Sequence, residues 1–294
     1  MHPFLLITLV AAALQTARFS LQKQLKLLGL STLSATAARF VTASPLAILL
    51  ALAICWARGY GWPTLSPDFW PAAMAGGAAQ IGATFFTVSL FAQRSFAVGI
   101  AFTKTEVLLV ALFSALFLGE TVSAGGLGAI LLGVLLLTRP KGGWKGDFFN
   151  KATLLGLSAG GLFGVASVGY RATTLAVGNE DAFFRAVFAL AAVTTFQTLL
   201  LLPWLIWFER GEVSRIAAAR VPALWAGVTG MLASVGWFWA FALMNAAYVR
   251  AVGQVELLFT LAVSTFIFHE KPSAREVSGI ALLALSIIGI MLQP

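Results

Sequence analysis

Charged residues are scarce in this sequence: Asp, Glu, Lys and Arg together make up 10% of its 294 residues. A soluble globular domain carries about 25%. Since 60% of the residues are hydrophobic and the mean hydropathy is +0.92, a soluble fold of this length would lack the polar residues to cover its surface. The other available solvent is lipid, in which helices satisfy their own backbone hydrogen bonds. The composition therefore indicates an all-α membrane protein.

Cysteine, histidine and catalytic motifs are also rare or missing. Cys55 is the single cysteine, which excludes an intrachain disulfide and a multi-cysteine metal site. His2 and His269 are the two histidines, so a histidine-based zinc enzyme is not expected. The sequence contains no P-loop, no His-Glu-x-x-His motif and no Gly-x-Ser-x-Gly motif. We therefore expect no cofactor, no metal and no enzymatic activity.

Apolar runs of about 20 residues, the length that crosses a membrane, follow one another with short breaks. The first run, from Phe4 to Leu14, has no basic segment before it, so we interpret it as a membrane helix and not as a cleaved signal peptide. We predict ten transmembrane helices, at residues 3–21, 31–57, 69–91, 95–118, 122–139, 152–170, 182–208, 221–244, 247–268 and 274–292.

The basic residues lie mainly between these runs, so the net charge of +8 reflects membrane topology and does not indicate nucleic-acid binding. Twelve of them fall in alternate connections: Lys23, Lys26, Arg94, Arg139, Lys141, Lys145, Lys151, Arg210, Arg215, Arg220, Lys271 and Arg275. Because cytoplasmic loops are enriched in Lys and Arg, we predict a multi-pass protein of the cell inner membrane with both termini extracytoplasmic.

The two halves of the chain resemble each other at a shift of 150 residues. Glu106 then falls on Glu256, and Glu120 falls on Glu270, in a chain with few acidic residues. Because each half has five predicted helices, an odd number, the second half enters the membrane from the opposite side. We predict two inverted five-helix repeats, an arrangement typical of transporters. The predicted boundaries are a first repeat at 1–140, a linker at 141–151 and a second repeat at 152–294.

The ends of the fourth and ninth predicted helices carry a family resemblance. They read Phe117-Leu118-Gly119-Glu120 and Phe268-His269-Glu270, and a helix rich in small residues follows each. This resembles the doubled EamA domain of the drug/metabolite transporter (DMT) superfamily. The resemblance implies a ten-helix secondary transporter, often an exporter of amino acids or other metabolites, here of the aromatic amino acid exporter type.

Charged and polar side chains inside the predicted helices are the candidate substrate-binding residues, because a charge at the bilayer centre costs about 2.5–3.5 kcal/mol on insertion scales. They are Arg39, Gln80, Lys104, Glu106, Arg185, Arg250, Gln254 and Glu256. We add Trp237 and Trp239, since an aromatic face can hold a cation or a ring. The alternative is structural: Glu106 and Glu256 would pair with Arg39, Arg185 or Lys104 and fix the helix packing.

These residues suggest a zwitterionic or amphipathic metabolite as substrate, with cations holding its carboxylate and acidic groups its ammonium. We expect export or facilitated movement of amino acids or similar metabolites by alternating access. The expected partners are that small molecule, the lipid bilayer and, if transport is coupled to their gradient, protons. A permease for organic cations or nucleoside-like solutes is the alternative, and a membrane-embedded enzyme or sensor is the rival from another class.

Overall fold

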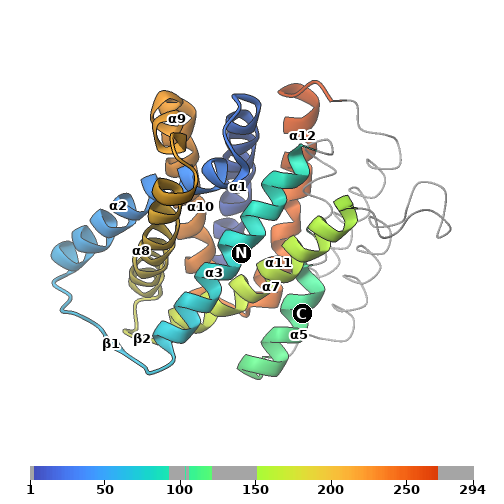
Figure 1. Cartoon of the computed structure of the whole chain (residues 1–294). Helices are drawn as coiled ribbons and strands as arrows, with labels where there is room; N and C mark the ends of the chain where they lie inside the picture. Colours follow the sequence, from blue (N-terminus) through green and yellow to red (C-terminus); the bar gives the residue numbers. More distant parts are fainter. Residues whose placement is uncertain (1–2, 93–102, 104–105, 121–150, 271–294) are drawn as a thin grey trace.

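The computed structural model describes residues 3–92, 103, 106–120 and 151–270, which are almost entirely helical (Figure 1). Within these ranges seven helices are long and apolar enough to cross a membrane. The predicted all-α membrane class is therefore confirmed. The predicted spans 122–139 and 274–292 lie outside the described residues, as does the first part of the span 95–118, so the total of ten helices stays a prediction.

The helices follow the predicted order along the chain. Their bounds are α1 (Pro3–Leu27), α2 (Thr32–Arg58), α3 (Phe69–Phe91), α5 (Glu106–Leu118), α7 (Lys151–Leu175), α8 (Ala182–Phe208), α9 (Glu212–Ala218), α10 (Arg220–Leu243), α11 (Ala246–Val252) and α12 (Glu256–Phe266). Two short strands, β1 (Thr64–Leu65) and β2 (Val177–Gly178), pair antiparallel and join the α2–α3 connection to the α7–α8 connection.

Three predicted helices differ from the structure. The sixth was predicted to end at residue 170, but α7 continues to Leu175. The first helix was predicted to end at residue 21, but α1 continues to Leu27 because the polar side chains after residue 21 have partners. The Gln22 amide donates to Ala35 O at 3.0 Å, and Lys23 forms an ion pair with Glu270. The ninth helix was predicted as continuous over 247–268, but a 3₁₀ segment, η2 (Gly253–Val255), separates α11 from α12.

Helices from the two halves of the chain pack in mixed pairs (Figure 1). α1 runs along α10, and α3 lies against α7. The second pair is close because glycines face each other: a Cβ atom added to Gly169 would come within 2.8 Å of Gly76 Cα. Small residues allow helix backbones to approach in this way where the bilayer supplies no hydrophobic drive between helices. Each half therefore depends on the other for its packing.

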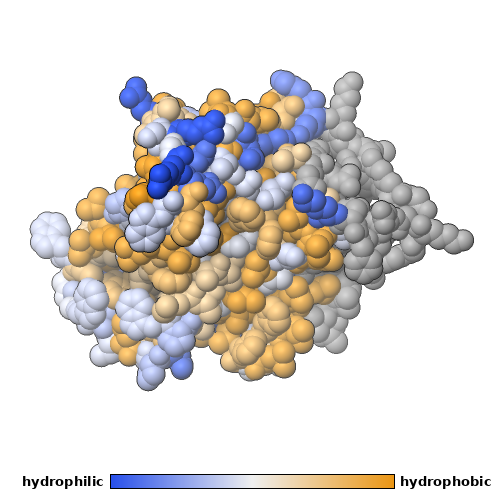
Figure 2. Space-filling view, viewed as in Figure 1, coloured by the Kyte–Doolittle hydropathy of each residue, from blue (hydrophilic) through white to orange (hydrophobic). Residues whose placement is uncertain are grey.

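The bundle has two ends, the upper one beside α9 and the lower one beside β1 and β2 (Figure 1). Between them the visible surface is largely hydrophobic, and the hydrophilic residues of this face gather mainly above it (Figure 2). Tryptophans project outward near the helix ends, among them Trp56 and Trp207, as expected of a membrane-interface belt.

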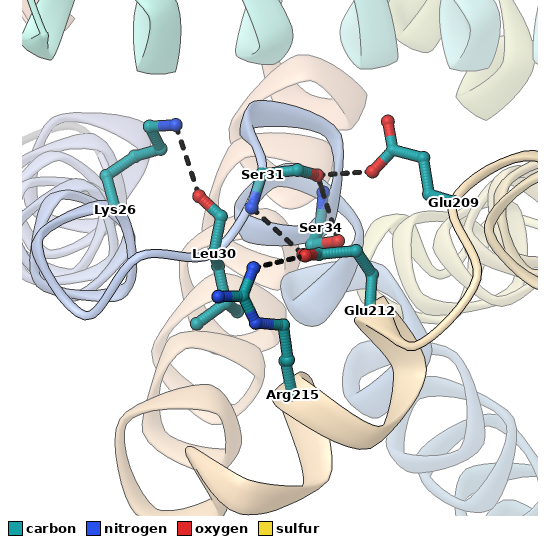
Figure 3. A network of polar contacts seen from close by, with 7 residues as sticks. All are labelled: Lys26, Leu30, Ser31, Ser34, Glu209, Glu212 and Arg215. Atoms are coloured by element: carbon teal, nitrogen blue, oxygen red, sulfur yellow. Dashed lines mark hydrogen bonds and ion pairs between the residues drawn. The ribbon is translucent and has the colours of Figure 1, made fainter.

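At the upper end, Ser31 begins α2 and meets α9 (Figure 3). The Ser31 hydroxyl accepts from Ser34 N at 3.0 Å and caps the helix. The Glu212 carboxylate accepts from Ser31 N at 2.9 Å and from Arg215 Nη1 at 2.7 Å. Burial opposes ionisation of this carboxyl, but hydrogen bonds from Ser34, Arg215 and Ser31, together with the Arg215 charge, outweigh it and lower the pKa of Glu212. The α1–α2 turn and α9 are thus tied together.

At the lower end, Asp181 begins α8. Its Oδ1 atom accepts from Phe183 N at 3.0 Å and from Phe184 N at 3.3 Å, which caps the helix. Its Oδ2 atom accepts from Tyr60 Oη at 3.3 Å and forms an ion pair with Arg58. The α2–α3 connection is therefore held to the start of α8.

Candidate functional site

Buried ionisable and amide side chains from five helices gather between the two ends of the bundle. We call this group the central polar cluster; its members are Gln15, Arg18, Arg39, Glu106, Arg250 and Glu256. Hydrogen bonds join several of them, and Arg18 lies within electrostatic range of Arg39, Arg250 and Glu256. Because charge inside a membrane protein is rare and costly, this cluster is the candidate functional site.

The break between α11 and α12 positions two members of the cluster. Arg250 stands in the last turn of α11, and Glu256 is the first residue of α12. The break coincides with Gly253, where a Cβ atom would come within 2.5 Å of the Trp237 ring. A short 3₁₀ segment inside a helix often marks a hinge. The absence of a side chain lets the Trp237 indole lie directly against the backbone at this point.

Arg250 forms a buried ion pair with Glu106, the first residue of α5. The Nη2–Oε2 distance is 3.1 Å, and both side chains are less than 10% exposed. Arg250 Nε also donates to Ser167 Oγ on α7 at 2.8 Å. The guanidinium carbon lies 4.7 Å from the centre of the Trp237 ring, which adds a cation–π contact. Arg250 therefore links α11 to α5, α7 and α10.

This pairing corrects one expectation from the sequence. Arg39, Arg185 and Lys104 were the suggested partners of Glu106, but among the described residues its arginine partner is Arg250. Glu106 and Arg250 are 144 positions apart and lie on different helices, so their sequence spacing does not tell whether their side chains face each other. Lys104 lies outside the described residues.

Glu256 connects the ninth predicted helix to α1. Its Oε2 atom accepts a hydrogen bond from Gln15 Nε2 at 3.1 Å, and the carboxylate is 1% exposed. Gln254, one turn after Arg250, donates from Nε2 to Arg250 O at 2.9 Å and leaves its Oε1 atom without a hydrogen bond.

Arg18 and Arg39 complete the cluster on the side of α10. Both cross Gly230, where a Cβ atom would come within 2.9 Å of Arg18 Cδ and of Arg39 Cγ. Arg39 Nη2 donates to Ser234 Oγ on α10 at 3.0 Å, and Arg18 Nη1 donates to Gln22 Oε1 at 2.9 Å. Two cationic side chains from α1 and α2 thus meet over one glycine.

Three candidates from the sequence form no hydrogen bond to a member of this cluster among the described residues. Gln80 is buried on α3, and within the described residues it forms no hydrogen bond to a cluster member. Arg185 lies near the lower end, where its Nη2 atom donates to Ala242 O at 3.3 Å. Trp239 packs its ring against Phe183, with 4.8 Å between the ring centres. The structure therefore brings together Arg39, Glu106, Trp237, Arg250, Gln254 and Glu256, and it places Arg185 and Trp239 elsewhere.

Gln15 and Arg18 were not among the site residues predicted from the sequence. Both fall inside the first predicted span, so the rule used for the other intramembrane charges applied to them as well. Their spacing of three residues, with Gln22 four residues further on, places all three on one face of a helix. Three polar side chains on one face of a membrane helix could therefore have identified Gln15 and Arg18 as candidate site residues.

Two further ion pairs stand at opposite ends of the bundle. At the upper end Lys23 of α1 pairs with Glu270, which follows α12. At the lower end Arg171 Nε of α7 lies 2.9 Å from Glu120 Oε1, which follows α5. Arg171 also donates to Phe241 O on α10. Each pair joins a helix of one half of the chain to a helix end of the other half.

Known proteins resemble this chain in two ways: a family model matches its second half, and a solved structure shares the fold of nearly the whole chain. No curated protein matches the sequence. Among solved structures, 27 chains match. One of them, described as "Crystal structure of protein", has a TM-score of 0.65 at 19% identity and covers 98% of this chain and 96% of its own. At that identity the likeness concerns the fold alone. Residues 151–292, just under half of this multi-pass membrane protein, match the model of the EamA-like transporter family.

Proposed function

We propose that this chain is a secondary transporter that exports or facilitates the movement of amino acids or similar small metabolites by alternating access. The observation that carries the proposal is the broken helix α11–η2–α12, which holds Arg250 and Glu256 inside the bundle beside Glu106. Transporter sites form typically at such breaks, near the midplane between repeats. The EamA-like domain at residues 151–292 supports the same class.

The proposal includes two inverted five-helix repeats, at 1–140 and 152–294. Ser31 and Asp181, which cap α2 and α8, are 150 residues apart and lie at opposite ends of the bundle. The pairing of α1 with α10 has its counterpart in the pairing of α7 with α3. These correspondences support an approximate two-fold axis in the membrane plane.

The two end ion pairs suggest how access alternates. Lys23–Glu270 closes the upper end and Arg171–Glu120 closes the lower end, and Glu120 and Glu270 are also 150 residues apart. In this mechanism the central polar cluster is closed to both sides when both pairs are formed. Opening one pair while the other stays formed would expose the cluster to one side of the membrane at a time.

The charges of the cluster favour a substrate that carries an anionic group. Within the described residues, Arg18, Arg39 and Arg250 accompany only two carboxylates, those of Glu106 and Glu256. An excess of buried cations disfavours the alternative of an organic-cation permease, because a cationic solute would add to the repulsion. A zwitterionic amino acid supplies a carboxylate for the arginines and an ammonium for a glutamate.

The test is counterflow in proteoliposomes. Vesicles containing the purified chain and loaded with one unlabelled amino acid should accumulate the same labelled amino acid, and protein-free vesicles should not. A panel covering apolar, aromatic and polar amino acids, with one organic cation and one nucleoside, separates the substrate classes. Accumulation of the cation or the nucleoside alone would replace the proposed substrate, and no accumulation of any solute would contradict transport.

A further inference from the structure

Arg18 and Arg39 form an unusual pair, because two buried arginines of like charge share one crossing point. Arg18 is 1% exposed and Arg39 is 5% exposed. Both aliphatic stems pass over Gly230, and the two guanidinium groups lie within electrostatic range of each other. Like charges repel, and burial weakens the screening by water that would reduce the repulsion. Something else in the functional state must compensate for this arrangement.

The hydrogen bonds of the pair are incomplete. Arg18 Nη1 donates to Gln22 and Arg39 Nη2 donates to Ser234, but both acceptors are neutral. In the described structure Arg18 Nη2, Arg39 Nε and Arg39 Nη1 are buried without any acceptor. Neither arginine forms an ion pair among the described residues. Arg18 has a carboxylate, that of Glu256, within electrostatic range, and Arg39 has only neutral hydrogen-bonding partners.

The missing groups are therefore acceptors that carry negative charge. A carboxylate has two oxygens with about four lone-pair sites and can accept several N–H groups at once. A guanidinium presents its donors in a planar fork that matches a carboxylate. One further donor lies on the same face of α10: Trp237 Nε1, three residues after Ser234, is also buried without an acceptor. Unfilled donors thus line one face of this helix.

We propose that Arg18 and Arg39 bind the carboxylate of the transported solute over the Gly230–Ser234 face of α10. This inference rests on the proposed function and assigns the part of the substrate that the cluster recognises. An alternative source of the same charge is an inorganic anion such as chloride. Glu106 and Arg250, which already neutralise each other, are not the carboxylate site.

The first experiment measures the melting temperature of the purified full chain with increasing amounts of added solute. The probes are L-leucine and L-phenylalanine, the carboxamide of each, benzoate and chloride. A ligand that binds only the folded protein raises its melting temperature. We expect the carboxylates to stabilise the wild type, and the carboxamides to bind at least about tenfold more weakly, because a charge-assisted hydrogen bond is lost. Equal binding of acid and amide, or no stabilisation by any carboxylate, would overturn the proposal.

The chloride arm decides the source of the anion. If chloride competes with the carboxylates only weakly, the site belongs to the solute. The opposite result has three parts: chloride stabilises the protein, its effect requires Arg39, and the carboxylates do not displace it. In that case the two arginines form a site for inorganic anions, and the proposal is wrong.

Arg39→Gln separates binding from a structural role. Because this substitution removes a buried charge that has no counter-charge, the ligand-free melting temperature should stay level or rise, while the carboxylate-dependent shift disappears. A structural role predicts the reverse, a lower ligand-free melting temperature with the shift retained. Arg210→Gln removes one positive charge from an exposed side chain between α8 and α9 and should change neither quantity.

A second pair of variants leaves the charges in place. Gly230→Ala pushes both arginine stems aside and should weaken carboxylate binding. Gly236→Ala crowds the same helix against Ala11, whose Cβ lies 2.8 Å from the added atom, and serves as the matched packing control. Equal effects of the two alanines on carboxylate binding would contradict the proposal. Carboxylate binding without counterflow would support this binding site but contradict the proposed transport. Counterflow that Arg39→Gln does not change would support transport but contradict this binding site.

Discussion

Gln15 on α1 donates a hydrogen bond to Glu256 on α12 across 241 residues of sequence, at 3.1 Å. Glu256→Gln keeps the shape of this contact and removes the charge. We expect counterflow to fall more than about tenfold with little change in melting temperature, because a charged group in the site acts on substrate or protons while the amide oxygen still accepts from Gln15. Both quantities should be measured on one preparation. If counterflow and melting temperature both fall, Glu256 has a structural role. If neither changes, its charge contributes to neither transport nor stability.

The Arg250–Glu106 pair should show strong coupling between its two residues. Arg250→Met leaves the Glu106 carboxylate buried without its arginine, and breaking a buried pair in this way costs about 3–5 kcal/mol. Adding Glu106→Gln should recover most of that stability, since no buried charge then remains of the pair. Chemical denaturation of the single and double variants measures the coupling. Additive losses in the double variant would show that the two side chains do not depend on each other.

The two end ion pairs should bias access in opposite directions. In a Cys55→Ser background, Ser234→Cys places a reporter thiol next to Arg39 of the central polar cluster. Glu270→Gln breaks the upper pair and should raise labelling of this thiol by a membrane-impermeant maleimide added from the upper side, while Glu120→Gln should raise it from the lower side. Labelling of right-side-out and inside-out vesicles compares the two sides. Increases on the same side for both variants would refute the gating role.

Stability should depend on acidic pH through Glu212. Its folded-state pKa is lowered, so it contributes stability that is fully present above the unfolded pKa of about 4.3 and is lost as the pH falls through the lower folded value. The difference in melting temperature between the wild type and Glu212→Gln should therefore be largest near neutral pH and shrink below pH about 4. Other carboxyl groups titrate in the same range, but they cancel in this difference. A difference that does not change with pH would mean that the carboxylate form of Glu212 adds nothing.

The orientation of the chain rests on its basic residues. Lys26 and Arg215 lie together at the upper end with α9, which we expect to face the cytoplasm (Figure 3). A reporter enzyme fused after Pro294 should then show periplasmic activity, with a fusion within the 210–220 segment as the cytoplasmic control. A cytoplasmic C-terminus would reverse the assignment of the two ends and exclude ten spans with both termini outside.

Hydropathy predicted most of the spans but little of the site. α2, α3 and α8 match their predicted spans within one or two residues, because a helix that crosses the bilayer needs an apolar run of about 20 residues, which can be recognised in the sequence. The extension of α1 depends on distant partners such as Glu270, which composition does not record. The break at Gly253 was not predicted, because glycines also occur inside unbroken helices of this chain, among them Gly160 in α7 and Gly230 in α10. The intramembrane charges could be picked out because a charge inside the bilayer is energetically unfavourable. The pairing between them could not be predicted, because it depends on how each helix is rotated about its own axis.

The close packing of α1 along α10 also constrains how the protein is made. α1 enters the membrane with Arg18 and Gln15, about 200 residues before the ribosome completes the helix that carries Gly230 and Ser234. During that interval these polar groups lack their final neighbours, and lipid cannot replace them. The polar contacts of the first helix with α10 are therefore completed only after the second half has been inserted.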